Sequence, residues 1–111
     1  MTHPASPRTA RLHEIAHARA GDKGNRLNIS LIPYDPAHYD LLAAQVPAER
    51  VLALFRHRGA TRAVRYDLPN LHAFNFVIDE VLEGGVNGSL NLDGHGKTHS
   101  FRLLGLTVEL P

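Results

Sequence analysis

The chain is short and nearly neutral. Its 111 residues, 43% of them hydrophobic, predict one globular domain with a modest core. The 12 Lys and Arg against 11 Asp and Glu argue against a nucleic-acid binder, which usually carries a basic excess. The absence of cysteine excludes a disulfide scaffold and any thiolate metal site or nucleophile. No apolar run reaches the ~18 residues of a membrane span and no signal peptide is recognised, so we expect a cytoplasmic protein without a membrane anchor.

The first third of the chain predicts a leader and two strands. Residues 1–10 contain two prolines and few large apolar residues, which predicts a flexible leader before a single domain over residues 11–111. Residues 11–18 alternate weakly without turn residues and predict a strand, on which His13 and His17 share a face. Two residues four apart on a strand are separated by about 13 Å, so this pair cannot bind one metal.

Residues 27–34 predict the second strand. Leu27, Ile29 and Leu31 alternate on one face and should be buried. Asn28 and Ser30 fall on the other face, where they would either line a polar pocket or face solvent on an open sheet.

Two short helices should follow the second strand. Asp35 as N-cap and Pro36 at the first helical position begin one of them. Pro47 separates it from a second helix over residues 48–58, which Gly59 ends. The apolar side chains of the two helices recur at helical spacing: Tyr39, Leu42, Ala43, Val46, Val51, Leu52 and Phe55.

The second half of the chain predicts strand, helix and strand. Residues 60–68 form the third strand, with Val64, Tyr66 and Leu68 on one face and Pro69 at its end. Leu104, Leu106, Val108 and Leu110 alternate and predict the last strand, after a bulge or a short helical turn near Phe101 and Leu103.

Between these strands we expect a helix that Asn70 caps and that runs to about Glu83, with Gly84 and Gly85 as its stop. Its buried stripe would be Leu71, Phe74, Ile78, Val81 and Leu82. Asn75 would lie in or beside that stripe and would need a specific partner, either a backbone group of residues 21–25 or a bound ligand. Phe76 would then be exposed and would suit a subunit contact.

The polar stretch over residues 17–28 is the leading candidate site. Two glycines three apart, Gly21 and Gly24, would let the backbone turn and expose N–H groups. Arg19 and Lys23 could hold an anion there, with Asp22 fixing one of them; the alternative is a solvated hairpin loop with an internal ion pair. The complete set of candidate ligand-binding residues is Arg19, Gly21, Asp22, Lys23, Gly24, Asn28, Asn70, Asn75 and Lys97.

A second polar stretch covers residues 85–97, with a short strand expected over residues 89–92. Its GHGKT sequence resembles a phosphate-binding loop, but Asn91 stands where that signature needs glycine, so we reject a nucleotide site of that type. Asp93, His95 and His99 form the best metal-ligating group, although such short clusters are commonly polar turns. We therefore expect neither a metal nor another cofactor.

Several strings resemble the small domain of the AtuA-like family, named for acyclic terpene utilisation. They are LHEIAHARAGDKGN at residues 12–25, NIS at 28–30, YDPAHY at 34–39, YDLPNLHAFNF at 66–76, GGV at 84–86 and SLNLDGHGK at 89–97. The resemblance covers roughly residues 11–110 and implies a ferredoxin-like fold. In the family, this domain occurs fused behind a large AtuA-type domain or as a separate protein, and this chain resembles the separate form. Together with the predicted elements, it indicates an α+β sandwich with a mainly antiparallel sheet of about four strands and helices packed on one face.

Three functions remain open, and the resemblance supplies no catalytic residues. The first is an accessory subunit of an AtuA-like large protein in the catabolism of branched or terpene-derived acids, as acyl-CoA compounds. The second is a free-standing acid–base enzyme of hydratase or isomerase type, with His17, Asp22, Lys23 and His95 as candidate groups. The third is a homo-oligomeric binder of a small anion, using Arg19, Lys23 and Lys97.

Overall fold

The structure is a computed structural model. It describes residues 8–23, 26–81 and 95–111, without the side chains of residues 22, 23 and 95–98. Among these residues no helix is both long enough and apolar enough to cross a bilayer.

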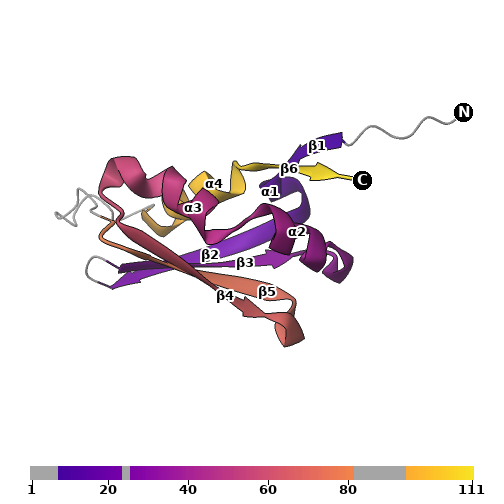
Figure 1. The fold of residues 1–111 in the computed structure, drawn as a ribbon, viewed down its shortest axis with the longest axis horizontal. Coiled ribbons are helices and arrows are strands. Elements are labelled where there is room, and N and C mark those ends of the chain that lie inside the picture. The colour runs from indigo at the N-terminus through magenta and orange to yellow at the C-terminus, as the bar shows by residue number, and fades with distance from the viewer. Residues whose placement is uncertain (1–7, 24–25, 82–94) are drawn as a thin grey trace, which may run out of the picture.

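Two antiparallel sheets form the frame of the molecule (Figure 1). The larger sheet has the order β2-β3-β5-β4, and each neighbouring pair in it is antiparallel. The smaller sheet pairs the first strand with the last. The strands are β1 (Arg8–Arg11), β2 (Ala16–Lys23), β3 (Arg26–Pro33), β4 (Arg62–Leu68), β5 (Ala73–Asp79) and β6 (Thr107–Leu110).

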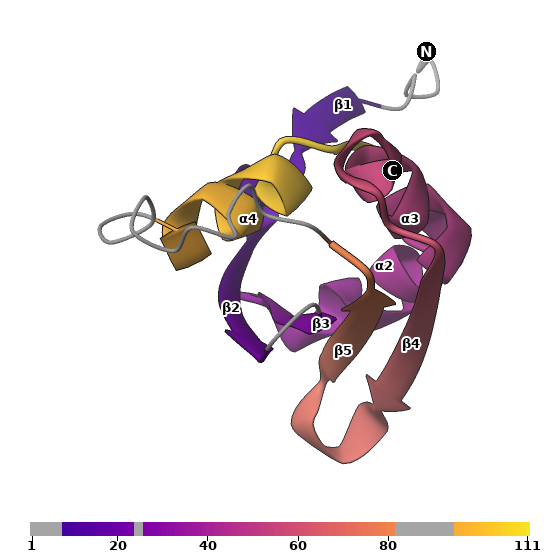
Figure 2. The ribbon, with the colours of Figure 1, turned by 90° about the vertical axis from the view of Figure 1, so that its left-hand side faces the viewer.

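The helices cover one face of the larger sheet. Figure 2 shows the four strands curling around α2, α3 and α4, so that the helices occupy the inner side and no described element covers the outer side. The helical elements are α1 (Leu12–Ile15), α2 (Tyr39–Gln45), α3 (Ala48–Phe55) and α4 (His95–Leu104), with single turns η1 (Pro36–His38), η2 (Arg56–Arg58) and η3 (Pro69–Leu71). This arrangement confirms the predicted α+β class, and it is compatible with a ferredoxin-like fold.

The centre of the fold is a split β-α-β unit. Strands β3 and β4 run parallel to each other with β5 between them, because β5 is antiparallel to both. The connection from β3 to β4 runs through α2 and α3, as an α-helical crossover between parallel strands requires. Strand β2 then takes the edge beside β3, and β6 pairs with β1 outside this sheet.

Alternation along the strands builds the core between sheet and helices. Leu27, Ile29 and Leu31 of β3 are all buried, as their spacing predicts. The predicted helices also bury their expected stripe, with Leu42, Val46, Val51 and Phe55 almost fully enclosed. Other large side chains that are completely buried are Leu12, Phe74, Phe76, Ile78 and Leu103.

The predicted helix boundaries around α2 and α3 are confirmed. The Asp35 carboxylate accepts a hydrogen bond from the Ala37 N–H at 2.9 Å, and Pro36 occupies the first position of η1. Pro47 separates α2 from α3. Gly59 ends the following turn at φ 94°, a left-handed conformation that glycine adopts without strain.

The helix predicted from Asn70 to Glu83 is wrong over its described part. Residues 69–71 form only the turn η3, and His72 turns the chain at φ 50° into strand β5. Phe74, Phe76 and Ile78 are buried at a spacing of two, so Phe76 lies in the core and cannot be the exposed subunit anchor that we expected. Apolar residues at positions 74 and 78 fit the spacing of a helix as well as that of a strand. The segment is a strand because it pairs with β3 and β4.

Both ends of the chain also differ from the prediction. Strand β1 begins at Arg8, inside the predicted leader, because Ala10 is buried where β1 pairs with β6. The predicted strand over residues 11–18 contains the single-turn helix α1, which places His13 on a helix. The predicted last strand begins too early, since α4 continues to Leu104 and only Thr107–Leu110 are extended. Residues 1–7, Gly84, Gly85 and the strand expected over residues 89–92 lie outside the described part.

Side chains of the helical layer hold the outer edge of β6. The Gln45 amide both donates to the Glu109 carbonyl at 2.8 Å and accepts from the Glu109 N–H at 2.7 Å, as a neighbouring strand would. Arg50 donates to the Thr107 carbonyl at 2.6 Å. These bonds satisfy backbone groups that an edge strand otherwise leaves open.

We expect Gln45→Ala to lower the free energy of unfolding by about 1–2 kcal/mol, because two backbone groups of Glu109 lose their partner. Urea denaturation measures this change, and amide hydrogen exchange should show faster exchange at Glu109 than in the wild-type protein. Glu49→Ala, at an exposed position of α3, is the control and should change stability by less than about 0.5 kcal/mol. Unaltered exchange at Glu109 would contradict the assignment.

Candidate functional site

The uncovered side of the larger sheet is the candidate site, and we call it the open face. On strands, residues of one parity share a face, and the register aligns these residues across all four strands. The open face consists of His17, Arg19 and Gly21 of β2; Arg26, Asn28, Ser30 and Ile32 of β3; Asn75, Val77 and Asp79 of β5; and Arg62, Val64, Tyr66 and Leu68 of β4.

A polar row crosses the middle of the open face. The register aligns Arg19, Ser30, Asn75 and Tyr66 on the four successive strands. The Ser30 hydroxyl donates to the Asn75 side-chain carbonyl at 3.4 Å, a long bond between half-buried groups. The side-chain oxygen of Asn75 thus has a hydroxyl of the neighbouring strand as a partner, whereas the binding of a ligand by Asn75 stays a prediction.

Exposed apolar and aromatic side chains lie at one end of the face. The rings of His17 and Tyr34 stack with their centroids 5.3 Å apart, which keeps Tyr34 on this side although it follows the end of β3. Tyr34 and Leu68 at this end are 64% and 38% exposed, and Tyr66 in the adjoining polar row is 52% exposed. Solvent-exposed aromatic groups gathered on one uncovered face are typical of a contact surface for another macromolecule.

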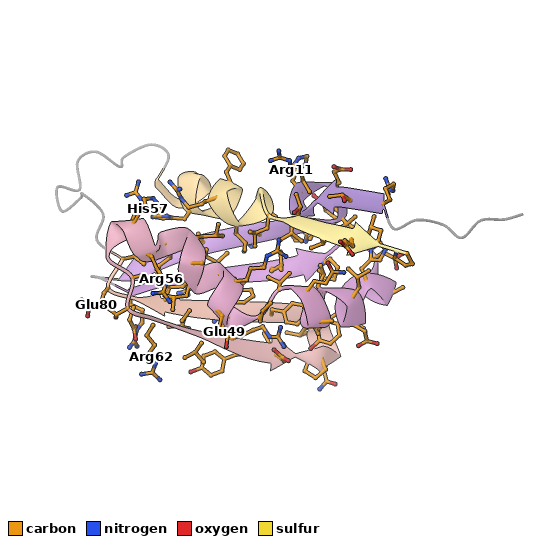
Figure 3. All side chains as sticks on the ribbon, turned by 45° about the horizontal axis from the view of Figure 1, so that its top comes forward. Arg11, Glu49, Arg56, His57, Arg62 and Glu80 are labelled. Carbon is orange, nitrogen blue, oxygen red and sulfur yellow. The ribbon has the colours of Figure 1, made fainter. Side chains whose placement is uncertain are left out.

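Basic side chains lie toward the other end, near the β2–β3 hairpin. Arg26 donates through Nε to the Asp79 carboxylate at 2.7 Å, with the arginine largely exposed. Arg62 pairs with Asp79 in the strand register and is also exposed. Figure 3 shows Arg62 at this end of the molecule, pointing away from the helices.

The predicted polar loop over residues 17–28 is mostly strand. Strands β2 and β3 pair as far as Lys23 and Arg26, which leaves Gly24 and Asn25, outside the described part, as the connection. Gly21 is an ordinary strand residue, because its φ angle is not positive. A Cβ atom added to it would lie 3.9 Å from the Asn28 side chain, which is ordinary van der Waals contact. The alternative that the sequence left open, a hairpin, is therefore the better description, because continuous pairing needs only a two-residue connection.

The candidate ligand-binding residues do not converge on one point. Arg19, Gly21, Asn28 and Asn75 share the open face. Asn70 lies in the turn η3 at the far end of β4, and Lys97 belongs to α4 in the helical layer on the other side of the sheet. Asp22 and Lys23 are placed only by their backbone, as successive residues of β2.

The four proposed catalytic groups are also separated. His17 stacks on Tyr34 near the start of β2, whereas Lys23 ends that strand, about 20 Å away at the usual rise per residue. His95 begins α4 in the helical layer. His17 and Lys23 therefore cannot exchange a proton directly, because a proton acceptor must lie within hydrogen-bond reach.

The metal candidates gain no structural support. Asp93 lies outside the described residues, and only the backbone of His95 is described. His99 is buried in the core against Phe55, with ring centroids 5.6 Å apart. Within the described part of the chain, no group of three or more ligating side chains could hold a metal ion.

Arg65 of β4 lies on the covered side of the larger sheet and links it to the helical layer. Its guanidinium donates to the carbonyls of Ala43 and Val46 at 2.8 and 3.0 Å, at the end of α2, and makes a two-point contact with Asp67. It also lies 5.1 Å from the centre of the Phe74 ring. This arginine thereby ties β4 and β5 to the crossover.

The Phe74 ring stacks on Tyr39, with centroids 4.7 Å apart and planes inclined by 7°. Burial raises the pKa of the Tyr39 hydroxyl, and the Asp67 carboxylate raises it further, while Arg65 opposes the shift. The neutral phenol is consequently the form that the folded state favours.

The sequence did not single out Tyr66 and Arg62 as site residues, although it placed Val64, Tyr66 and Leu68 on one face of a strand. The signal that could have found them is that this face carries a large aromatic residue beside charged ones, in a chain where few residues are aromatic. The sequence analysis predicted a helix where β5 lies, and without this strand Tyr66 of β4 could not be aligned with Asn75 and Ser30.

Comparison with known proteins gives one match. The family model described as the AtuA ferredoxin-like domain matches residues 10–109, almost the whole chain. No curated protein and no solved structure matches the chain significantly.

Because the folded state holds the Tyr39 proton more tightly than the unfolded chain does, stability should fall as the pH rises above the ordinary tyrosine pKa of 10.0 and approaches the raised pKa. Below that range this contribution is complete. Urea denaturation at several pH values should show a steeper loss in the wild-type protein than in Tyr39→Phe. Equal slopes above pH 10 would show that Tyr39 titrates alike in both states.

Proposed function

The chain belongs to the family of AtuA ferredoxin-like domains, and we propose that it is an accessory subunit that docks on a large AtuA-type protein. The complex would act in the catabolism of branched or terpene-derived acids, handled as acyl-CoA compounds. The substrate class in this proposal rests on what the family resemblance implies. The docking role rests on the geometry of the open face.

The observation that carries the docking role is an uncovered sheet face with exposed aromatic side chains. Strands curl around the helices, so the open face is the outer side of the sheet (Figure 2). A small molecule is usually bound in a concave site that encloses most of its surface. An outward-curving face with Tyr34, Tyr66 and Leu68 exposed is better suited to another protein surface.

The two alternatives find less support. A free-standing acid–base enzyme needs its acid and base within reach of one substrate, and His17 is remote from Lys23 and from the start of α4. A homo-oligomeric anion binder would use Arg19, Lys23 and Lys97, but Arg19 and Lys97 belong to elements on opposite sides of the sheet's plane.

Co-purification from the native host, with this chain as bait in mild salt, tests the proposal. We expect a large AtuA-type protein in fixed stoichiometry, and activity toward acyl-CoA compounds only in the complex. Recovery of the chain alone as a discrete oligomer would contradict the subunit role and favour a self-contained binder or enzyme.

Tyr66→Ala should weaken the complex by about tenfold or more, because truncating an exposed aromatic anchor of an interface commonly costs that much. Phe101→Ala is the matched control: Phe101 is 66% exposed, but it lies on α4, in the layer behind the sheet. Isothermal titration calorimetry with the purified large protein measures both affinities. Equal effects of the two substitutions would exclude the open face as the docking surface.

A further inference from the structure

The open face carries charge of almost one sign. Among its described side chains, Arg19, Arg26 and Arg62 are cationic, and all three are exposed. Asp79 is its only carboxylate in this described set, and Arg26 already pairs with it at 2.7 Å. Lys23 shares the strand parity of Arg19, so its backbone position adds a fourth basic residue to the same edge of the sheet.

The chain as a whole has a formal net charge of only +1, so this basic excess is local. The other described acidic residues lie off this face: Asp22 in β2 at the strand parity opposite to Arg19, Glu14 in α1, Asp35 before η1, Asp40 in α2, Glu49 in α3, Asp67 on the covered side of β4, Glu80 beyond the end of β5 and Glu109 in β6. Glu80 directly follows Asp79, and Figure 3 shows it at the same end of the molecule as Arg62.

Resting on the docking role proposed above, we propose that the open face binds an acidic surface of the large AtuA-type protein, with Arg19 and Arg62 opposite carboxylates of that partner. The two arginines lie on the two edge strands, β2 and β4, with Ser30 and Asn75 on the strands between them, and Tyr66 lies on β4 with Arg62. A complementary partner therefore presents carboxylates toward both edges of the sheet and contacts Tyr66 at the β4 edge.

The same charges argue against two other occupants. A second copy of this chain would bring one basic face against another, and like charges brought together across an interface are costly. A nucleic acid would be drawn to a basic face, but this face places Tyr34 and Leu68 in the same surface, and the chain lacks a general basic excess.

Exposed arginines of this kind act at a distance. They speed the encounter with an acidic surface and set its orientation, and salt screens that attraction over about 8 Å at physiological ionic strength. The affinity of the complex should therefore fall by about tenfold between 50 and 300 mM NaCl. The loss should appear mainly in the association rate.

Charge reversal tests the proposal on the full chain and the purified large protein. Arg19→Glu and Arg62→Glu should each weaken the complex by about tenfold at 50 mM NaCl and flatten its salt dependence. Arg8→Glu is the matched control, because it changes the net charge equally from an exposed position of β1 in the smaller sheet. Surface plasmon resonance gives both rate constants, and thermal unfolding shows that all variants remain folded.

The outcomes separate this proposal from the function on which it rests. A stable complex that is insensitive to salt, or that Arg8→Glu weakens as much as Arg62→Glu, overturns the acidic surface and leaves the subunit role standing. No complex with the wild-type chain at any salt concentration overturns both. Binding of a labelled single-stranded oligonucleotide that Arg19→Glu and Arg62→Glu abolish, in place of protein binding, also overturns the acidic protein partner.

Discussion

The fold depends on a sheet that has two faces and helices for only one of them. Four strands bury one set of alternate residues, with Leu27, Ile29 and Phe76 at its centre, against α2, α3 and α4. The other set must remain outside, because side chains of successive strand residues point to opposite faces. The polar and charged residues of this second set in β2, β3 and β5 therefore belong to the open face. The composition of that face follows from the need to fill the core.

Side chains of the helical layer complete backbone pairing where strands end. Gln45 satisfies the free edge of β6 in the smaller sheet, and Arg65 binds the carbonyls at the end of α2 from the covered side of β4. Both residues link segments far apart in the sequence. Because hydrogen bonds to half-buried backbone groups are costly to leave unmade, Arg65 helps to position the crossover that carries β4 alongside β5. The open face is broad because β4 is held there.

A broad, outward-curving face changes which functions are physically reasonable. The described polar residues of the open face are spread over four strands of an outward-curving surface. They can match a second surface, with aromatic contact at one end and basic residues toward the other. Charge then decides between a second copy of this chain and a partner of opposite sign. The membership in the AtuA ferredoxin-like family supplies the candidate for that partner.

The sequence by itself determined the elements whose signals are local. Asp35, Pro36, Pro47 and Gly59 mark the ends of helices through capping chemistry and restricted backbone angles, and the alternation of Leu27, Ile29 and Leu31 predicts the buried face of β3. Only the tertiary structure decided β5, because apolar residues at 74 and 78 fit a helix and a strand equally well until β3 and β4 pair with them. The same pairing brought Asn75 beside Ser30 and aligned Tyr66 with both. A site spread over four strands is fixed by their register, and register is a property of long-range hydrogen bonding that single stretches of sequence do not contain.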